Sequence, residues 1–151
     1  MQVYQKKISP KEFEILKIAS DAEISPHLIS WKNIARSCSN YIIAEIELYP
    51  FTLGDIPINR RKIYVDSIKN KLMQLYNMGI FHGDIHEENI VINPDTQQVR
   101  LIDFGQSKFL NEITPDFLLR YDMYFDIVNN IDDLLAMELR EVDIISGVNY
   151  S

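Results

Sequence analysis

The segment from residue 59 to residue 105 constrains the fold of this chain most, because a helix signal, a polar loop and a hairpin signal follow one another without a break. Apolar residues repeat in its first part with the three-and-four spacing of an amphipathic helix, at Val65, Ile68, Leu72 and Leu75. Gly79 then stands where a helix C-terminal cap belongs. The pattern predicts a long helix over residues 59–78.

Two short apolar runs, residues 89–93 and 97–102, flank the tripeptide Pro94-Asp95-Thr96. Proline, aspartate and threonine in this position are strong turn formers, so the two runs are predicted to pair as an antiparallel hairpin. A polar segment precedes the hairpin and reads His82-Gly83-Asp84-Ile85-His86-Glu87-Glu88-Asn89. The far strand runs into Ile102-Asp103-Phe104-Gly105.

The first part of the chain indicates strands and one helix. Residues 2–8 have the pattern of a short strand, and residues 27–32 and 40–47 are strand-like, with a turn over residues 37–40. A helix start lies between them, with Ser9 as N-cap, Pro10 in the first turn and Glu12 closing a capping box. Helical periodicity returns from residue 115 to about residue 140. The fold class is therefore α+β.

Composition excludes several classes of protein. At 151 residues and 46% hydrophobic, the chain is long enough for one compact domain, residues 1–151, and too short for two. The net charge of -7 argues against direct, sequence-independent binding of nucleic acid, and the cluster Arg60-Arg61-Lys62 is expected to be a solvated helix start. The single cysteine, Cys38, excludes an internal disulfide and a thiolate metal cage. No apolar stretch is long enough to cross a bilayer, so we expect a cytoplasmic protein without a membrane partner.

The two polar motifs together resemble the catalytic loop and the metal-binding motif of the protein kinase superfamily, most clearly over residues 64–108. The resemblance implies a two-lobe fold, with a reduced small lobe of a few strands and one helix over about residues 1–47. A minimal, mainly helical catalytic lobe then covers about residues 48–151. The implied activity is phosphoryl transfer that depends on ATP and Mg²⁺.

The resemblance also implies roles for individual residues. Asp84 would orient the acceptor hydroxyl and take its proton, and His82 and His86 complete the candidate catalytic set with Asn89. The hairpin would bring Asp103 beside Asn89, so that their oxygens hold Mg²⁺ against the phosphates of the nucleotide. Each residue alone has an ordinary structural explanation, such as a turn or a core histidine, and only the combination indicates phosphoryl transfer.

Three features narrow the branch of the superfamily. Gly83 precedes Asp84 where regulated protein kinases usually carry arginine, and His86 stands where they usually carry lysine. The form His-Gly-Asp-Ile-His resembles aminoglycoside phosphotransferases and choline kinases. The small size resembles the Rio kinases, the kinase subunit of the KEOPS complex and miniature kinases of large DNA viruses, which would place the protein in the host cytoplasm.

The nucleotide-binding half departs from the family pattern, because no glycine precedes Gly54 and the usual glycine-rich loop therefore has no counterpart in residues 1–53. Lys6 or Lys7 would bind the α- and β-phosphates, with Glu12 as the ion-pair partner of that lysine. Alternatively, Glu12 only completes the capping box and both lysines are solvated charges on an edge strand.

The strand over residues 41–48 resembles the strand that leads into a kinase hinge. Backbone groups from Glu45 to Glu47 would then hydrogen-bond the adenine, and Ala44 and Val91 would pack on its two faces. The alternative is that these residues are core strand residues and nothing more.

Two functions remain open. The first is an active minimal serine/threonine protein kinase that acts on a protein substrate. The second is a pseudokinase that has lost catalysis and serves as a kinase mimic or interaction module for a partner kinase or protein complex. A small-molecule kinase, suggested by His86, is less well supported because 151 residues leave no room for a helical substrate region. The sequence leaves the oligomeric state open.

Overall fold

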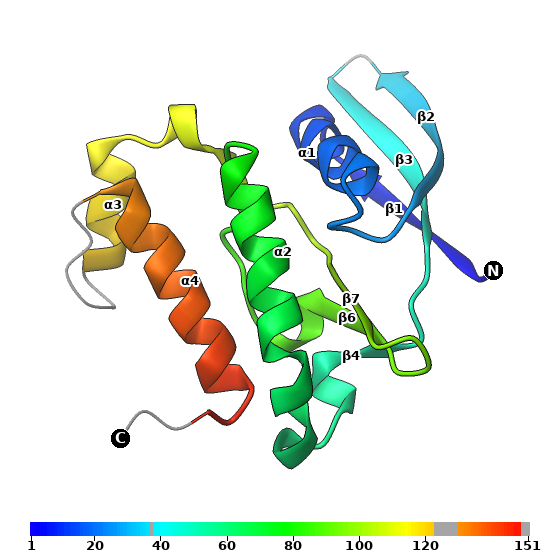
Figure 1. The fold of residues 1–151 in the computed structure, drawn as a ribbon. Helices are drawn as coiled ribbons and strands as arrows, with labels where there is room; N and C mark the ends of the chain where they lie inside the picture. Colours follow the sequence, from blue (N-terminus) through cyan, green and yellow to red (C-terminus); the bar gives the residue numbers. More distant parts are fainter. Residues whose placement is uncertain (37, 123–129, 149–151) are drawn as a thin grey trace.

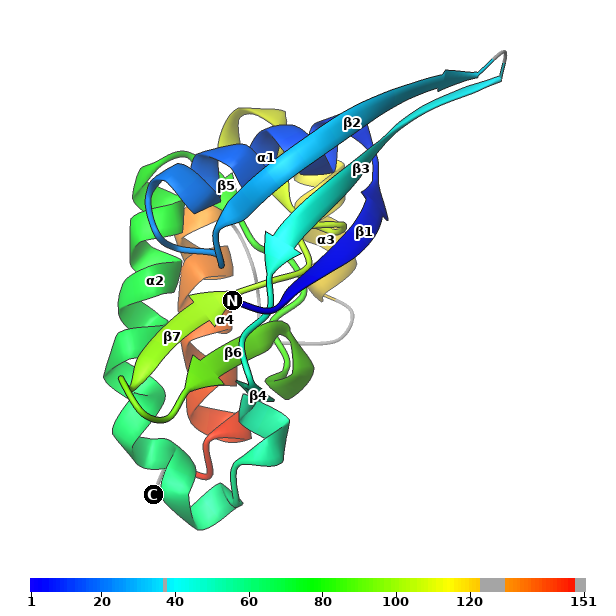
Figure 2. The same cartoon turned by 90° about the vertical axis from the view of Figure 1, so that its right-hand side faces the viewer.

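The computed structural model describes residues 1–36, 38–122 and 130–148, and it divides them into a small lobe and a larger, mainly helical lobe (Figure 1). The small lobe consists of β1 (Val3–Ile8), α1 (Pro10–Asp21), β2 (Leu28–Arg36) and β3 (Ser39–Glu47). Its three strands form one antiparallel sheet in the order β1-β3-β2. The β2–β3 hairpin extends beyond the rest of the molecule (Figure 2). The predicted α+β fold with two lobes is confirmed.

The face of the sheet that packs on α1 is set by the two-residue period of the strands. Ile42, Ala44 and Ile46 of β3 are buried and belong to the same core cluster as Ile15 and Leu16 of α1. This cluster continues into the large lobe without interruption, and the backbone N–H of Leu101 donates to the carbonyl of Ile24 across the boundary at 2.8 Å. One core therefore holds the two lobes together.

The start of α1 is built as predicted, with one correction. Ser9 is the N-cap, its Oγ accepts the backbone N–H of Glu12 at 3.1 Å, and Pro10 opens the helix. The carboxylate of Glu12, however, does not close a capping box but binds the Lys6 ammonium at 3.0 Å. An ion pair with a half-buried lysine is stronger than a hydrogen bond to an exposed cap, because solvent screens it less.

The large lobe contains the remaining elements. Its strands are β4 (Phe51–Thr52), β5 (Ile80–Phe81), β6 (Ile90–Asn93), β7 (Gln98–Leu101) and β8 (Lys108–Phe109). Its α-helices are α2 (Val65–Asn77), α3 (Pro115–Asp122) and α4 (Ile131–Ile145). Short 3₁₀ turns are η1 (Leu53–Asp55), η2 (Ile58–Tyr64), η3 (Glu87–Asn89) and η4 (Leu110–Glu112). The strands form two small sheets, β4-β6-β7 and β5-β8.

The predicted long helix is correct at its end and wrong at its beginning. Met78 and Gly79 close α2, and Gly79 has φ +86°, a left-handed conformation that glycine adopts without strain. Residues 58–64, however, form the 3₁₀ helix η2, and the α-helix begins only at Val65. Within η2, the side chain of Arg61 turns inward instead of lying on a solvated surface and is only 8% exposed.

The predicted hairpin is confirmed as β6 and β7, which pair antiparallel from Ile90 opposite Leu101 to Asn93 opposite Gln98. Asn93 fixes the turn because its Oδ1 accepts the backbone N–H of Asp95 at 3.1 Å. The predicted C-terminal helices are confirmed over α3 and α4, whereas the part of that prediction covering residues 123–129 lies outside the described residues. None of the helices in the described ranges is long and apolar enough to span a membrane.

Candidate active site

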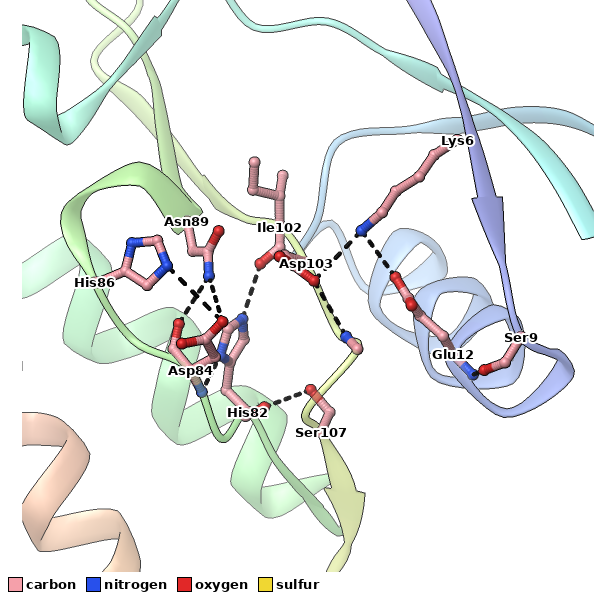
Figure 3. Close-up of polar contacts among 11 residues, drawn as sticks. Lys6, Ser9, Glu12, His82, Asp84, His86, Asn89, Ile102, Asp103 and Ser107 are labelled. Atoms are coloured by element: carbon pink, nitrogen blue, oxygen red, sulfur yellow. Dashed lines mark hydrogen bonds and ion pairs between the residues drawn. The ribbon is translucent and has the colours of Figure 1, made fainter.

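The loop between β5 and η3 is held in place by His82 (Figure 3). The backbone N–H of Asp84 donates to Nδ1 of His82 at 3.2 Å, so the ring proton is on Nε2, which lies 2.9 Å from the carbonyl oxygen of Ile102. Burial lowers the pKa of His82, which keeps the ring neutral. The predicted catalytic role of His82 is wrong, because the side chain is fully buried and cannot touch a substrate. It is a positioning residue that joins the loop to the strand before Asp103.

Asp84 of this loop and Asn89 of η3 lie against each other. The Nδ2 of Asn89 donates to the carbonyl of Asp84 at 2.9 Å and to its carboxylate Oδ2 at 3.2 Å. This geometry points the Oδ1 of Asn89 away from Asp84 (Figure 3). His86 flanks the same carboxylate, with its Nε2 3.8 Å from Oδ2, while its Nδ1 accepts the backbone N–H of Glu88 at 3.2 Å.

Asp103 is reached by Lys6 from the small lobe. The Lys6 Nζ lies 3.0 Å from Oε2 of Glu12 and 3.3 Å from Oδ1 of Asp103, so one ammonium joins β1, α1 and the chain after β7 (Figure 3). Asp103 has φ +62°, an uncommon value for a residue with a side chain, and its Oδ1 also accepts the N–H of Gly105 at 3.3 Å.

The charges of this cluster stabilise one another. Burial raises the pKa of Asp103, but the Lys6 ammonium and the Gly105 N–H outweigh burial and lower that pKa below its usual value. Burial lowers the pKa of Lys6, and the carboxylates of Glu12 and Asp103 more than compensate, so that it is raised. Both groups are therefore charged at neutral pH.

Lys7 does not join the cluster. Neighbouring residues of a strand point to opposite faces of the sheet, and the Lys7 ammonium lies 4.3 Å from the centre of the Tyr41 ring instead. The sequence left Lys6 and Lys7 as alternatives, and the structure brings only Lys6 to Glu12 and Asp103.

A cavity of about 310 Å³ lies between the lobes beside this cluster. Its wall is formed by residues of both lobes and of their connection: Tyr4, Lys6, Pro26, Glu47, Leu48, Tyr49, Thr52, Asn89, Val91, Ile102 and Asp103. Val91 and Glu47 thus line a cavity between the lobes, and their predicted contact with a nucleotide base stays a prediction. Ala44 is fully buried in the core, which agrees with its alternative interpretation as a core strand residue.

The prediction for Glu45 is a different case, because Glu45 is not on the cavity wall. Strand β3 runs on to Glu47, and Glu45 lies opposite Gln5 of β1 and Ser30 of β2. A residue between two paired strands has its backbone engaged in the sheet. The connection between the lobes follows β3, and the N–H groups of Glu47 and Leu48 donate to the carbonyls of His27 and Gln2 there, at 2.9 and 2.8 Å.

Two residues that were not selected from the sequence, Glu138 and Arg61, support the candidate catalytic loop. The Oε2 of Glu138 on α4 accepts the backbone N–H of Gly83 at 3.0 Å, although Glu138 is only 5% exposed. Burial raises the pKa of Glu138 to about 8, and the N–H groups of Gly83 and His82 counter it only in part. A carboxylate on the apolar face of α4, four residues after Leu134, was the signal available in the sequence.

Arg61 is the second such residue, and it corrects the prediction of a solvated basic cluster. Its Nη1 lies 2.7 Å from the carboxylate of Glu87, next to the catalytic loop, and donates to the carbonyl of Ile145 at 2.9 Å. Its Nε donates to the carbonyl of Ile56 at 2.8 Å. Arg61 thereby joins the catalytic loop to the end of α4.

Gly83 occupies a position that admits no side chain. Its φ is +89°, and a Cβ atom there would collide with the backbone carbonyl of Gln106. Gly79 has a similar φ of +86°, but a Cβ atom there would meet nothing within 4 Å. The close approach of residues 83 and 106 therefore requires glycine for a reason beyond backbone conformation.

Gly83→Ala is expected to lower the free energy of unfolding by about 2 kcal/mol or more, because left-handed strain and a backbone collision add together. Gly79→Ala carries only the strain and is the matched control, with an expected loss of about 1 kcal/mol. Urea unfolding of both variants measures the difference. Equal losses would contradict the close approach at Gly83.

The donor atoms present fit Mg²⁺ bound together with a nucleotide. Mg²⁺ prefers oxygen ligands and is commonly held by one or two carboxylates together with the phosphates of the substrate. Asn89 offers its Oδ1 and Asp103 an ionised carboxylate, and both line the same cavity as Lys6. Among the described residues no three His, Cys, Asp or Glu side chains gather into a metal site that would be complete without a ligand.

Comparison with known proteins places this geometry in a family. A family model for the protein kinase domain matches residues 4–124. The chain belongs to the protein kinase domain family. Its fold is similar to that of the Cydia pomonella granulovirus kinase PK-1, with a TM-score of 0.64 at 14% sequence identity over 96% of this chain and 60% of that one.

Curated relatives of this kinase domain come from a virus and from yeast. Serine/threonine-protein kinase 1 of African swine fever virus is 28% identical over 123 residues, which are 76% of this chain and 40% of the viral protein. Protein kinase MCK1 of Saccharomyces cerevisiae is 26% identical over 117 residues, which are 70% of this chain and 31% of the yeast protein. The chain thus spans less than half the length of either relative.

Proposed function

We propose that this kinase domain transfers the γ-phosphoryl group of ATP, in a reaction that requires Mg²⁺, to a serine or threonine hydroxyl of a protein. The observation that carries the proposal is the gathering of Lys6, Asn89 and Asp103 from separate elements on one cavity, with Asp84 hydrogen-bonded to Asn89. The viral relative is named a serine/threonine-protein kinase, which supports the choice of acceptor.

Each side chain has a distinct task in the proposed reaction. Lys6 binds the phosphate chain, and Glu12 holds the ammonium in place from α1. Asn89 and Asp103 supply oxygen ligands for Mg²⁺, which neutralises charge on the phosphates when it is bound. Asp84 accepts the proton of the attacking hydroxyl, and His86, 3.8 Å from its carboxylate, is placed to meet the transferred phosphoryl group.

Matched substitutions of the two neighbouring lysines test the nucleotide site. Lys6→Met is expected to weaken ATP binding in the presence of Mg²⁺ by roughly tenfold or more, because it removes a charge that contacts the phosphates. Lys7→Met removes the same charge from the opposite face of β1 and is expected to leave affinity unchanged. Calorimetric titration of both variants with ATP measures the difference.

Transfer of labelled phosphate from ATP to the protein itself or to a generic protein substrate tests the reaction. Binding of ATP without transfer would favour the pseudokinase alternative, in which the domain serves as an interaction module. Transfer to a small alcohol or aminoglycoside but to no protein would mean that the acceptor is a small molecule and not a protein. Failure of the wild-type protein to bind ATP at all would overturn the proposal.

A further inference from the structure

Glu88 has no task in the proposed reaction, although it directly precedes Asn89 in η3. Its side chain is exposed, and its Oε2 accepts a hydrogen bond from Oγ1 of Thr52 at 3.2 Å. The two residues are 36 positions apart in the sequence. The contact therefore joins β4, the first strand after the connection between the lobes, to the 3₁₀ turn that carries a proposed metal ligand.

Gly54 shows that this contact is built into the fold. A Cβ atom at residue 54 would collide with the carboxylate of Glu88. Gly54 is not among the residues with a positive φ, so its backbone conformation does not require glycine. The close approach of the Glu88 side chain is thus the reason that the structure gives for a glycine at this position.

Both ends of the contact reach the nucleotide cavity. Thr52 and Asn89 line its wall, whereas Gly54 and Glu88 do not. Thr52 also lies opposite Val91 in the pairing of β4 with β6. Glu88 therefore has no direct contact with a ligand in this cavity, and its neighbours on the wall are Thr52 and Asn89.

Asn89 is held on its other sides by the catalytic loop and by the residue after β7. Its backbone N–H donates to the carbonyl of His86, and its carbonyl accepts the N–H of Ile102, both at 3.0 Å. Its Nδ2 donates to Asp84, which leaves Oδ1 for a metal ion. The contact between η3 and β4 adds a third support for the same residue.

The hydroxyl of Thr52 is also close to a second carboxylate, because its Oγ1 lies 3.3 Å from Oδ2 of Asp55. A hydroxyl has one proton, so the two carboxylates share it. Asp55 keeps a second hydrogen bond, from the backbone N–H of Thr52 at 2.9 Å, which does not depend on the hydroxyl. Removal of the hydroxyl therefore releases Glu88 while the start of η1 stays capped.

We propose that Glu88 is a positioning residue of the phosphoryl-transfer site, whose contact with Thr52 and Gly54 fixes η3 so that Oδ1 of Asn89 stays oriented for Mg²⁺ bound with the nucleotide. Its effect is on the part of nucleotide binding that depends on the metal, and not on the nucleotide alone. This inference rests on the nucleotide and Mg²⁺ binding proposed above and deepens it.

The test compares the affinity for ATP in MgCl₂ with the affinity for ATP in EDTA, by calorimetric titration of the whole chain. Gly54→Ala displaces the Glu88 carboxylate, and Thr52→Val removes the hydroxyl with little change of shape. In both variants the ratio of the two affinities is expected to fall about threefold to tenfold, the usual worth of one hydrogen bond. Thr52→Ser restores a hydroxyl and is expected to keep the wild-type ratio. Thr96→Val is the matched control, because the Thr96 hydroxyl lies in the exposed turn of the β6–β7 hairpin.

A double variant separates one shared contact from two independent effects. Glu88→Ala and Thr52→Val remove opposite partners of the same hydrogen bond, so the double variant is expected to lose no more of the ratio than the larger single loss. Losses that multiply in the double variant would mean that the two residues act independently, and the inference would be overturned.

The outcomes also separate this inference from the function on which it rests. If Mg²⁺ strengthens ATP binding by wild type, and Gly54→Ala and Thr52→Val keep its ratio, the role of Glu88 is refuted and the proposed kinase function stands. If the variants lose ATP affinity equally in MgCl₂ and in EDTA, the contact supports the cavity wall and not Asn89, which also refutes the inference. If wild type binds no ATP, or binds it equally with and without Mg²⁺, both proposals fail.

Discussion

Asp84→Asn is expected to lower the rate of phosphoryl transfer by about a hundredfold to ten-thousandfold, the usual contribution of a positioned general base. Asparagine has nearly the same shape as aspartate, so the hydrogen bond from Nδ2 of Asn89 to the backbone carbonyl of residue 84 remains. What is lost is the carboxylate that we propose accepts the proton of the substrate hydroxyl. The affinity for ATP is therefore expected to stay close to that of wild type.

The measurement is the rate of phosphate transfer from labelled ATP with Mg²⁺, together with ATP affinity. Asp95→Asn is the matched control, because Asp95 lies in the exposed turn of the β6–β7 hairpin, where its N–H donates to Asn93. A variant Asp84→Asn that transfers phosphate at the wild-type rate would remove Asp84 from the role of base. A loss of ATP binding equal to the loss of rate would mean that Asp84 acts mainly by supporting the nucleotide site.

Glu138→Gln is expected to remove a pH dependence of stability that wild-type protein has. Burial raises the pKa of Glu138 from its ordinary value to about 8. Between the ordinary pKa of a glutamate and about 8, the unfolded chain has lost the Glu138 proton while the folded chain retains it. The free energy of unfolding of wild type therefore falls as pH rises through this window, by up to about 1.4 kcal/mol per pH unit.

The contribution of Glu138 is thus fully present below the unfolded pKa and is lost as pH rises through the folded pKa. Glutamine cannot ionise, so the free energy of unfolding of Glu138→Gln is expected to change less between pH 5 and pH 8 than that of wild type. The two changes are expected to differ by several kcal/mol across the range. Urea unfolding at a series of pH values measures it. Glu141→Gln, on the same helix and half-exposed, is the control. Parallel pH profiles for Glu138→Gln and wild type would contradict the buried, protonated carboxyl.

The same substitution has a consequence for the catalytic loop. Glu138 accepts the backbone N–H of Gly83, directly before the proposed base Asp84. Glutamine retains one acceptor oxygen, so the loop is expected to keep its position at every pH. In wild type, ionisation of Glu138 at high pH places a negative charge at the backbone N–H of Gly83, directly before Asp84. Residue 83 is a glycine, where regulated protein kinases usually carry arginine. The backbone carbonyl of Gln106 leaves no space for an arginine side chain there.

Local signals in the sequence predicted much of the fold correctly. The Ser9 cap, the end of α2 at Gly79 and the β6–β7 hairpin were all predicted from residues within a few positions of one another. These elements depend on backbone conformation and neighbouring hydrogen bonds, which short sequence patterns specify. The roles of Asp84, Asn89 and Asp103 were implied by the resemblance to the protein kinase superfamily and stay predictions.

Choices stayed open, or were made wrongly, where a residue had two possible partners. Glu12 could close a capping box or pair with a lysine, and the choice depended on how α1 lies against β1. The backbone groups predicted to bind adenine began at Glu45, which lies inside β3, because the length of β3 depends on pairing with both neighbouring strands. Arg61 was assigned to the surface because nothing near it in the sequence reveals Glu87 or the end of α4.

The sequence by itself determined the order of the elements, the two-lobe kinase fold and the side chains available for phosphoryl transfer. Only the tertiary structure decided that Lys6 rather than Lys7 reaches Asp103, that His82 is a buried positioning residue, and that Glu138 supports the loop at Gly83. The physical reason is sequence distance. Caps and turns are specified by neighbouring residues, whereas an ion pair across 97 positions forms only when packing of the core brings two faces together.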